Sequence, residues 1–490
     1  MKNQLVKNKR INSYGLSHEV MGISIDSREV NRGDLFFSLE QRKIKALSHI
    51  NQAIDKGALG IISSKNFDNN SIDTKIPIIE VDSVRKELSI ISSEFYPNQP
   101  RIVAAITGTN GKTSVAKFTE QIWKNNGIAS ASIGTLGNSR FFSDSSLTTP
   151  DPVSLHKQLN DLSMSDYENV IIEASSHGLD QHRIDNVRLS GAAFTSFSRD
   201  HLDYHKNMKQ YLNAKKRLFT SLIEKDSTAV INLIGINRRY HGFINDICSR
   251  NLITIGTSNA TINLLGFSRS SNKKINLKIS VNGQLVVIET PFIALFQAIN
   301  ATIAGCVASM DSRISLMDYL MSITLLKDIS GRLEFVASKY TDANIYVDYA
   351  HTPSAMRAVL ESLRPVTKNK LILVFGAGGN RDKGKRNFMR DIAKNYADFI
   401  IVTDDNPRFE APETIRKEVL EACPNGIEIE DRGKAISAAI RDLKNNDVLL
   451  IAGKGHEQGQ SIKGQILSFN DEQMVRDILA KDYPSSRGSK

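Results

Sequence analysis

Cysteine is scarce in this 490-residue chain, which has only Cys248, Cys306 and Cys423. The three residues lie far apart and form no CxxC pair. Their number and spacing argue against a disulfide framework or a zinc cluster and fit a reducing compartment. We expect all three to be core residues.

Long apolar runs are also missing. No run approaches the ~20 residues that a membrane-spanning helix needs. The charged N-terminus, MKNQLVKNKR, is followed by no apolar signal core. We therefore expect a cytoplasmic protein without a membrane span.

The charge is unbalanced, with 63 Lys and Arg against 53 Asp and Glu and a net charge of +10. Such an excess favours acidic partners, either nucleic acid or phosphate-rich small molecules. The basic residues are scattered, and no basic arm interleaved with aromatics or recognition-helix motif occurs. We expect no nucleic-acid partner, and a general bias towards Lys, Asn and Ile is the alternative explanation of the charge.

Short apolar runs alternate with helical patterns along the chain, among them RIVAAI, NVIIEA, KLILVFG and DVLLIAG. This alternation indicates an α/β protein with parallel sheets and crossover helices. The length exceeds what one core usually serves, and junctions are expected at 96–100 and near 327–331. The sequence predicts three domains, at 1–97, 98–330 and 331–490.

The segment RIVAAITGTNGKTSVAKF predicts a strand, a glycine-rich turn and a helix. In such a turn the backbone N–H groups approach phosphates, Lys112 reaches the β and γ phosphates, and Thr113 can ligate Mg²⁺. The spacing departs from GxxxxGK[ST], because Ile106 stands five residues before Gly111. The alternative is a glycine-rich turn that binds nothing.

Glu173 ends the apolar run NVIIE and is followed by the polar stretch SSHGLDQHR. A carboxylate at the carboxyl edge of the sheet lies beside the phosphate loop, where it can share Mg²⁺ with ATP oxygens. The alternative is a helix cap or a salt-bridge partner.

The segment DDNPRFEAP, residues 404–412, directly follows the apolar run DFIIVT. Asn-Pro predicts a tight loop at the end of a strand, where open α/β sheets bind ligands. Arg408 can grip a carboxylate with two parallel hydrogen bonds, and the acids can hold an ammonium group. The loop therefore predicts zwitterion binding, with a solvated turn and an exposed arginine as the alternative.

Motifs over most of the chain resemble, in order, those of the Mur ligases and, within that family, the UDP-N-acetylmuramoyl-tripeptide synthetases. They are ITGTNGKTS, LTTPD, EASSHGLDQHR, SRDHLDYH, NAKKRLF, SGRLE, DYAHTP, FGAGGNRDKGKR, DDNPR and AGKGHE. The resemblance implies a central P-loop-type ATPase domain with a mostly parallel sheet, a smaller α/β N-terminal domain and a Rossmann-like C-terminal domain.

The resemblance also implies an activity in peptidoglycan precursor synthesis. ATP, with Mg²⁺, would activate the substrate UDP-N-acetylmuramoyl-L-Ala-D-Glu as an acyl phosphate, and the amine of meso-diaminopimelate would then attack it. DNPR accompanies meso-diaminopimelate in the family, whereas lysine-adding enzymes lack this arginine. We expect a monomer.

Residue by residue, the resemblance implies four sets of contacts. The ATP set is Gly108, Thr109, Asn110, Gly111, Lys112, Thr113, Ser114, Asn300, Arg332 and His351. The metal set is Thr113, Glu173, His201 and a carbamylated Lys215, and Lys112 joins Glu173, His201 and Lys215 as catalytic residues. The muramoyl-dipeptide set is Ser27, Thr148, Thr149, Ser175, Gln181 and Arg183. The diaminopimelate set is Arg381, Asp405, Asn406, Pro407, Arg408, Gly453 and Glu457.

Two of these assignments depend wholly on the resemblance. Lys215 belongs to a lysine-rich helical pattern, for which a solvated face is the ordinary interpretation. His201 and His205 have i, i+4 spacing, but a helix-terminal or core histidine is the ordinary interpretation.

The N-terminal part departs from the family. It keeps DSR and GDLFFSL, which suggests that Ser27 meets the uridine end, yet EQRKIKALSH at 40–49 replaces a glycine-rich stretch. Without glycine the segment cannot make the same turns with positive φ, which leaves the contacts of Arg42 to Ile44 open.

Three alternatives remain. A lysine-adding ligase is disfavoured by Arg408, and a folylpolyglutamate or cyanophycin synthetase is disfavoured by DSR, HGLDQHR and DNPR. The third alternative is a non-catalytic nucleotide-binding relative. It is disfavoured because the chain keeps Lys112, Thr113, Glu173, His201 and Lys215, which such a protein need not retain.

Overall fold

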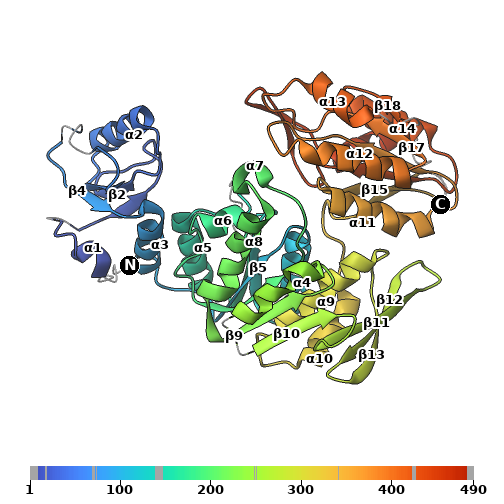
Figure 1. Ribbon diagram of the computed structural model, residues 1–490, viewed down its shortest axis with the longest axis horizontal. Helices are drawn as coiled ribbons and strands as arrows, with labels where there is room; N and C mark the ends of the chain where they lie inside the picture. Colours follow the sequence, from blue (N-terminus) through green and yellow to red (C-terminus); the bar gives the residue numbers. More distant parts are fainter. Residues whose placement is uncertain are drawn as a thin grey trace, which may run out of the picture.

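The computed structural model describes residues 9–16, 19–68, 72, 74–137, 147–247, 249, 251–339, 342–421 and 426–482. Three large β-sheets follow one another along the described chain and give three α/β domains (Figure 1). This confirms the predicted fold class, while the boundaries at 97/98 and 330/331 stay predictions. Cys306 is buried, and Cys248 and Cys423 lie outside the described residues.

The N-terminal domain has a four-stranded parallel sheet in the order β1-β2-β3-β4. Its strands are β1 (Gly22–Ser24), β2 (Asp34–Phe37), β3 (Gly60–Ser64) and β4 (Ile78–Val81), and its helices are α1 (Lys9–Asn12), α2 (Lys43–Asp55) and α3 (Val84–Phe95).

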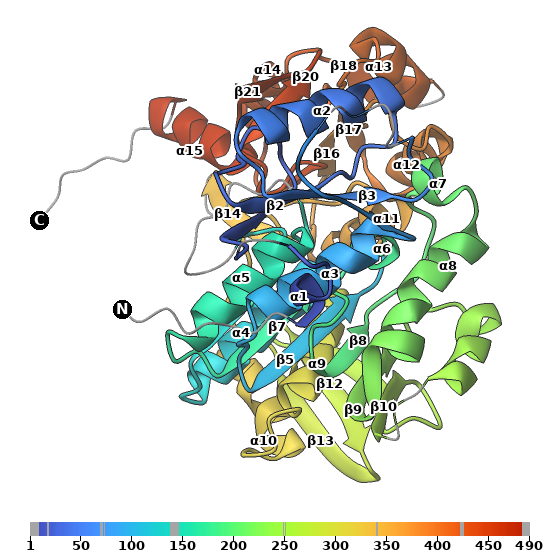
Figure 2. The same ribbon diagram turned by 90° about the vertical axis from the view of Figure 1, so that its left-hand side faces the viewer.

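Helix α2 takes up most of the EQRKIKALSH segment, and no residue from 40 to 49 has a positive φ. The segment therefore forms the start of a helix and not a turn with positive φ. Figure 2 shows the N-terminal domain towards the viewer, with α3 against the central domain.

The central domain has a nine-stranded sheet in the order β13-β12-β11-β10-β9-β8-β5-β7-β6. The strands are β5 (Ile102–Thr107), β6 (Ser130–Ile133), β7 (Asn169–Glu173), β8 (Leu189–Phe194), β9 (Ile223–Asn232), β10 (Asn251–Gly256), β11 (Ile262–Arg269), β12 (Ile275–Val281) and β13 (Gln284–Glu289). Strands β5 to β11 pair in parallel, whereas β11, β12 and β13 form an antiparallel meander. The sequence patterns did not predict this meander.

Alternate residues of β5 enter different cores, as a strand covered on both faces requires. Ile106 packs with α4 (Lys112–Asn125) and α9 (Leu295–Ala308), and Ala105 packs with α5 (Pro152–Ser163) on the opposite face. The single tryptophan, Trp123, joins α4 to α9 by donating its indole N–H to Ala308 O at 3.1 Å. The phosphate-loop helix is therefore anchored in the central core.

The C-terminal domain has a six-stranded sheet in the order β14-β15-β19-β16-β17-β18, in which only the β14–β15 pair is antiparallel. Its strands are β14 (Glu334–Lys339), β15 (Ala343–Asp348), β16 (Leu371–Phe375), β17 (Phe399–Val402), β18 (Gly426–Glu428) and β19 (Val448–Ala452), with a hairpin of β20 (Gly459–Ile462) and β21 (Gln465–Ser468). Helices α11 (Pro353–Leu363), α12 (Gly384–Tyr396) and α13 (Pro412–Leu420) cover one face, and α14 (Arg432–Asp442) and α15 (Asp471–Asp482) cover the other.

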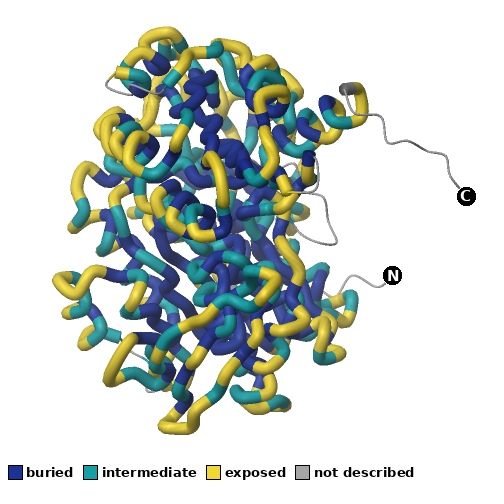
Figure 3. Tube along the Cα trace, turned by 90° about the vertical axis from the view of Figure 1, so that its right-hand side faces the viewer, coloured by how far each residue is buried: buried dark blue, intermediate teal, exposed yellow. Residues whose placement is uncertain are grey.

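Shorter helices connect these layers. They are α6 (Ser176–Asp180), α7 (Leu202–His205), α8 (Met208–Arg217), α10 (Leu316–Met321) and the irregular turns η2 (Leu218–Leu222), η3 (Arg238–Asp246), η4 (Ser322–Leu325) and η5 (Arg364–Val366). Figure 3 shows the buried residues gathered in the interior and the exposed ones on the outer helices and loops. None of the helices in the described part of the chain is long and apolar enough to cross a membrane.

Helix α15 depends on one buried ion pair. The Arg432 guanidinium donates to both Asp471 oxygens at 2.7 Å, and neither side chain has any exposed surface. We expect Asp471→Ala to leave a buried cation unpaired and to lower the free energy of unfolding by about 3–5 kcal/mol. Thermal and denaturant unfolding measure this loss. The matched control is Glu472→Ala, which removes a surface i, i+4 pair with Arg476 and should cost no more than ~0.5 kcal/mol. Equal costs for the two variants would contradict the prediction.

Candidate active site

The phosphate loop joins β5 to α4 through two glycines in conformations that side chains rarely adopt. Gly108 has φ +152° and Gly111 has φ +90°. A Cβ atom on Gly111 would lie 2.8 Å from Asn300 Oδ1, so glycine is required for both the turn and the close approach of α9. The loop thus leaves the N-terminus of α4 open to a phosphate.

Two lysine side chains converge on one carbonyl of this loop. Lys112 Nζ donates to Gly108 O at 2.9 Å, and Lys215 Nζ donates to the same oxygen at 2.8 Å. Lys215 is only 1% exposed, so the interpretation of a solvated lysine face is wrong for this residue. Burial and the nearby charge of Lys112 hold the pKa of Lys215 well below its usual value.

Thr113 and Glu173 lie side by side where β7 ends. The Glu173 carboxylate is buried and accepts hydrogen bonds from Thr113 Oγ1 and from the Thr135 N–H, both at 2.9 Å. Arg332 of the C-terminal domain approaches from the other side, with Nη2 3.2 Å from Thr113 Oγ1. Hydroxyl and carboxylate oxygens are the ligands that Mg²⁺ prefers, so this pair fits a magnesium ion that also binds phosphate.

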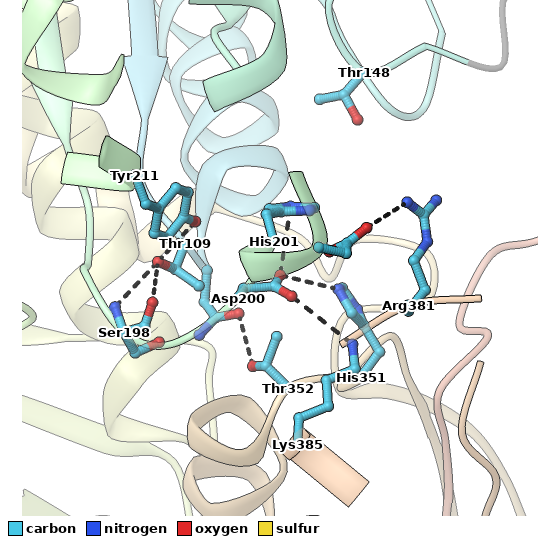
Figure 4. A network of polar contacts seen from close by, with 12 residues as sticks. Thr109, Thr148, Ser198, Asp200, His201, Tyr211, His351, Thr352, Arg381 and Lys385 are labelled. Carbon is cyan, nitrogen blue, oxygen red and sulfur yellow. Dashed lines mark hydrogen bonds and ion pairs between the residues drawn. The ribbon is translucent and has the colours of Figure 1, made fainter. Parts of the chain in front are cut away.

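Asp200 lies at the centre of a network between the central and C-terminal domains (Figure 4). Its carboxylate is 3.4 Å from His201 Nε2, 3.8 Å from His351 Nε2 and 3.8 Å from Lys385 Nζ. Burial raises the pKa of Asp200, but the neighbouring histidines and lysine outweigh it and hold that pKa well below its usual value. Sequence reasoning gave Asp200 no role, although it stands in the SRDHLDYH motif.

His201 precedes α7 as its N-cap, in a left-handed conformation with φ +53°. Its ring lies 4.9 Å from that of His177, and His177 lies 5.6 Å from His205. Burial lowers the pKa of His201 to about 3, so its imidazole is neutral and has a lone pair for a ligand. His205 is buried, and its Nε2 has no hydrogen-bond partner among the described residues.

A cleft of about 700 Å³ lies between the central and C-terminal domains, and the phosphate loop, Glu173 and Asp200 line it. Among the predicted residues it is lined by Thr109, Asn110, Gly111, Lys112, Thr113, Ser114, Thr148, Glu173, Ser175, Arg183, His201, Asn300, Arg332, His351 and Arg381. Gly108, Thr149 and Lys215 are not in its lining. Lys215 is held beneath the loop through Gly108 O, and Thr149 is buried, with its hydroxyl donating to Glu173 O at 2.7 Å.

Arg183 lines this cleft and is hydrogen-bonded to Gln181, which lines a second cleft. Its Nη1 donates to Thr149 O at 2.7 Å, and its Nη2 donates to Gln181 Oε1 at 2.8 Å. Arg85 of α3 donates to the same Gln181 oxygen at 3.3 Å. Neither arginine has a carboxylate partner among the described residues, so this corner attracts an anion.

Gln181 and Arg85 line the second cleft, of about 670 Å³, between the N-terminal and central domains. Ser38, Glu40 and His49 contribute to its N-terminal side. Ser27 does not line it, because this residue is buried and its hydroxyl donates to Gln52 Oε1 at 2.7 Å. The structure thus separates Ser27 from the other predicted muramoyl-dipeptide residues.

A smaller pocket of about 100 Å³ opens at the carboxyl ends of β16, β17 and β19. Six of the predicted diaminopimelate residues line it, namely Arg381, Asp405, Asn406, Arg408, Gly453 and Glu457, and Pro407 does not. Asp200, His201, His351 and Arg381 line both this pocket and the large cleft. The two spaces therefore meet at these four residues.

Arg408 lines the pocket with a left-handed backbone conformation and a guanidinium that is bonded only to backbone carbonyls among the described residues. It has φ +55°, and its Nη1 donates to Gly379 O at 2.9 Å and Asn406 O at 3.3 Å. No carboxylate of the described chain pairs with it, so its guanidinium is available to a ligand. Of the two acids before it, Asp404 is bound by Arg416 at 2.5 Å, which leaves Asp405 facing the pocket. The interpretation that both acids hold an ammonium is therefore wrong for Asp404.

Further contacts between the two domains were missed in the sequence. Arg199 forms a two-pronged ion pair with Asp382 at 2.8 and 3.0 Å. Asn110 of the phosphate loop donates to Ser354 Oγ at 3.0 Å and accepts from Thr352 Oγ1 at 3.2 Å. The motifs contain these residues, but only the folded chain pairs them.

Two family models match the chain: the Mur ligase middle domain over residues 106–308 and the Mur ligase, glutamate ligase domain over residues 331–455. Two similar curated proteins are UDP-N-acetylmuramoyl-L-alanyl-D-glutamate–2,6-diaminopimelate ligases. That of Mesorhizobium japonicum is 41% identical over 478 residues, covering 94% of this chain and 95% of the relative. That of Zymomonas mobilis is 42% identical over 480 residues, covering 95% and 97%.

Among solved structures, a UDP-N-acetylmuramoyl-L-alanyl-D-glutamate–2,6-diaminopimelate ligase is similar, with a TM-score of 0.65 and 29% identity over 94% of this chain and 95% of that one. The MurF ligase from Thermotoga maritima, in complex with ADP, shares the fold, with a TM-score of 0.63 and 16% identity over 94% and 98% of the two chains. The phosphate loop, the fold and these matches agree, and the chain belongs to the Mur ligase family.

Proposed function

We propose that this protein is an ATP-dependent ligase that adds meso-2,6-diaminopimelate to UDP-N-acetylmuramoyl-L-alanyl-D-glutamate in peptidoglycan precursor synthesis. One observation carries the proposal. The phosphate-loop cleft and the pocket around Arg408 share Asp200, His201, His351 and Arg381. An acyl phosphate formed in the cleft therefore meets an amine held in the pocket.

The first step is attack of the D-glutamate carboxylate on the γ-phosphate of ATP, which forms an acyl phosphate and releases ADP. Lys112 and the N-terminus of α4 hold the phosphates, and Arg332 stacks on the Tyr349 ring at 4.4 Å beside Thr113. Thr113 and Glu173 would hold one Mg²⁺, and His201 and a carbamylated Lys215 a second. The bound Mg²⁺ supplies charge neutralisation for the transferred phosphoryl group.

Carbamylation of Lys215 resolves an electrostatic conflict. A protonated Lys215 would place a second ammonium on the Gly108 carbonyl beside Lys112, inside a buried site, and burial and the charge of Lys112 therefore hold the pKa of its amine well below the usual value. In carbamylation, the neutral amine attacks CO₂, an N–C bond forms, and one proton is released. The product carries a negative charge where a metal ligand is required.

The second step is attack of the amine on the acyl phosphate, with phosphate as the leaving group. Arg408 binds the distal carboxylate of diaminopimelate, and Asp405 and Glu457 balance its distal ammonium. L-lysine has no second carboxylate, so its binding would leave the Arg408 guanidinium without a partner. This favours the diaminopimelate ligase over the lysine-adding form.

The nucleotide end of the muramoyl substrate would occupy the cleft between the N-terminal and central domains, with Arg183 and Gln181 towards the dipeptide. Ser27 contributes there only if its hydrogen bond to Gln52 is exchanged for the substrate. A cytoplasmic location, a monomeric state and the domain boundaries at 97/98 and 330/331 are part of the same proposal.

The substrate assignment is tested by phosphate release with ATP, Mg²⁺ and UDP-N-acetylmuramoyl-L-Ala-D-Glu. We expect release with meso-diaminopimelate and not with L-lysine or without an amino acid. Arg408→Ala should raise the KM for meso-diaminopimelate roughly 30-fold or more, since loss of one partner of a charged pair costs at least ~2 kcal/mol. The control Arg357→Ala, at an exposed ion pair with Glu361, should leave this KM unchanged. Release with lysine would refute the amino-acid specificity, and no release with any amine would favour the non-catalytic alternative.

The role of Lys215 is tested by Lys215→Arg, with Lys216→Arg as the matched neighbour. Lys216 pairs with Asp246 at 2.7 Å and is partly exposed. We expect Lys215→Arg to lower kcat at least ~100-fold, because a guanidinium cannot become a carbamate ligand. After incubation with ¹³C-bicarbonate, a carbamate carbon signal should appear in the wild type and in Lys216→Arg but not in Lys215→Arg. A carbamate signal that persists in Lys215→Arg would contradict the assignment.

A further inference from the structure

Lys454 is a buried lysine beneath the pocket that contains Arg408. It follows β19 and the pocket residue Gly453, and its side chain has no exposed surface. Lys454 is not in the lining of the pocket, whereas Asn406 and Glu457 are. A fully buried ammonium is costly unless it is paired, so its partners define its role.

Those partners are two residues that face the ligand space. Lys454 Nζ donates to Glu457 Oε2 at 2.8 Å and to Asn406 Oδ1 at 3.3 Å. Asn406 Nδ2 donates to the same Glu457 oxygen at 2.9 Å. One oxygen of Glu457 therefore accepts two hydrogen bonds, and its other oxygen, Oε1, has no partner among the described residues.

The amide of Asn406 is fixed as well. Its Oδ1 accepts a hydrogen bond from the Ser461 N–H at 2.8 Å in addition to the one from Lys454. This arrangement leaves its Nδ2 group directed to Glu457. A flexible glutamate side chain at the rim of a pocket would otherwise lose rotamer freedom when a ligand binds.

We propose that Lys454 is a positioning residue that sets amino-acid affinity by holding Glu457 with one free carboxylate oxygen towards the ligand ammonium. The inference rests on the proposed function and names a residue beyond those assigned there. Lys454 touches neither the amino acid nor the reacting atoms. It acts through Glu457 and Asn406.

The test is a double-mutant cycle of Lys454→Met and Glu457→Gln, followed by phosphate release at varied meso-diaminopimelate. We expect Lys454→Met to raise the KM for meso-diaminopimelate roughly 10- to 100-fold, as for loss of one charged hydrogen bond. The KM for ATP and the kcat at saturating amino acid should change little. In the Glu457→Gln background, adding Lys454→Met should produce no further rise, because the group that it positions is already altered.

The control is Lys339→Met, which removes another buried lysine of the same domain. Lys339 donates to Ile440 O and Arg441 O at 2.7 Å and is not part of the pocket. It should not change the KM for the amino acid. If Lys454→Met does not fold, Lys454→Gln keeps a hydrogen-bond donor on a side chain that is one bond shorter, and it should give an intermediate KM.

Two results separate the inference from the function on which it rests. Wild-type turnover with meso-diaminopimelate, together with an unchanged KM in Lys454→Met or with additive effects in the cycle, would overturn the positioning role alone. Absence of wild-type turnover with meso-diaminopimelate would overturn the proposed function and, with it, the role of Lys454.

Discussion

The buried carboxylate of Asp200 is the contact on which the shared site depends. A buried carboxylate needs cationic or hydrogen-bonding partners, and Asp200 finds them on two domains. His201 belongs to the central domain, whereas His351 and Lys385 belong to the C-terminal domain (Figure 4). Asp200, His201 and His351, together with Arg381, line both the large cleft and the pocket around Arg408, so the two spaces meet at these residues. The position of the C-terminal domain therefore determines whether the two substrates meet.

The charged side chains around the phosphate loop depend on one another for charge balance. Lys112 and Lys215 bring two amino groups to the Gly108 carbonyl, and Glu173 lies across the loop as a buried carboxylate. Neither a bare cluster of lysines nor a bare cluster of acids would be stable there. In the proposed function, phosphates, metal ions and a carbamate supply the missing partners of these groups.

The outline of this site was predictable from the sequence because it follows backbone rules. Parallel strands end at one edge of a sheet, so Glu173 after β7 and Arg408 after β17 had to lie at such edges. The loop from Gly108 to Thr113 follows from its glycines and from the strand and helix around it. These predictions need only local pattern and topology.

Other features were not predictable because they depend on packing between distant segments. Lys215 and Lys216 are adjacent in one lysine-rich helix, and only the docking of α8 under the phosphate loop decides which of them is buried. Asp404 and Asp405 look equivalent until Arg416 neutralises the first. The β11–β13 meander was missed because its outward residues include exposed apolar ones, such as Phe267 and Val287, which blur the alternation.

The contacts between the central and C-terminal domains are polar in part and apolar in part. The contacts formed by Arg199, Asn110 and Asp200 are ion pairs and hydrogen bonds, and the Arg199 side chain is 42% exposed. Exposed ion pairs are typically worth about 0.2–1 kcal/mol each, because water competes for both partners. Exposed pairs such as Arg199–Asp382 therefore contribute little to holding the domains together, whereas Asp200 is buried and Ile293, Ala294 and Phe296 of the central domain pack in the apolar core of the C-terminal domain. In the proposed function, bound phosphates and carboxylates add partners for Lys112, Arg332 and Arg183 on both sides of the cleft, and this added binding energy holds the two domains together.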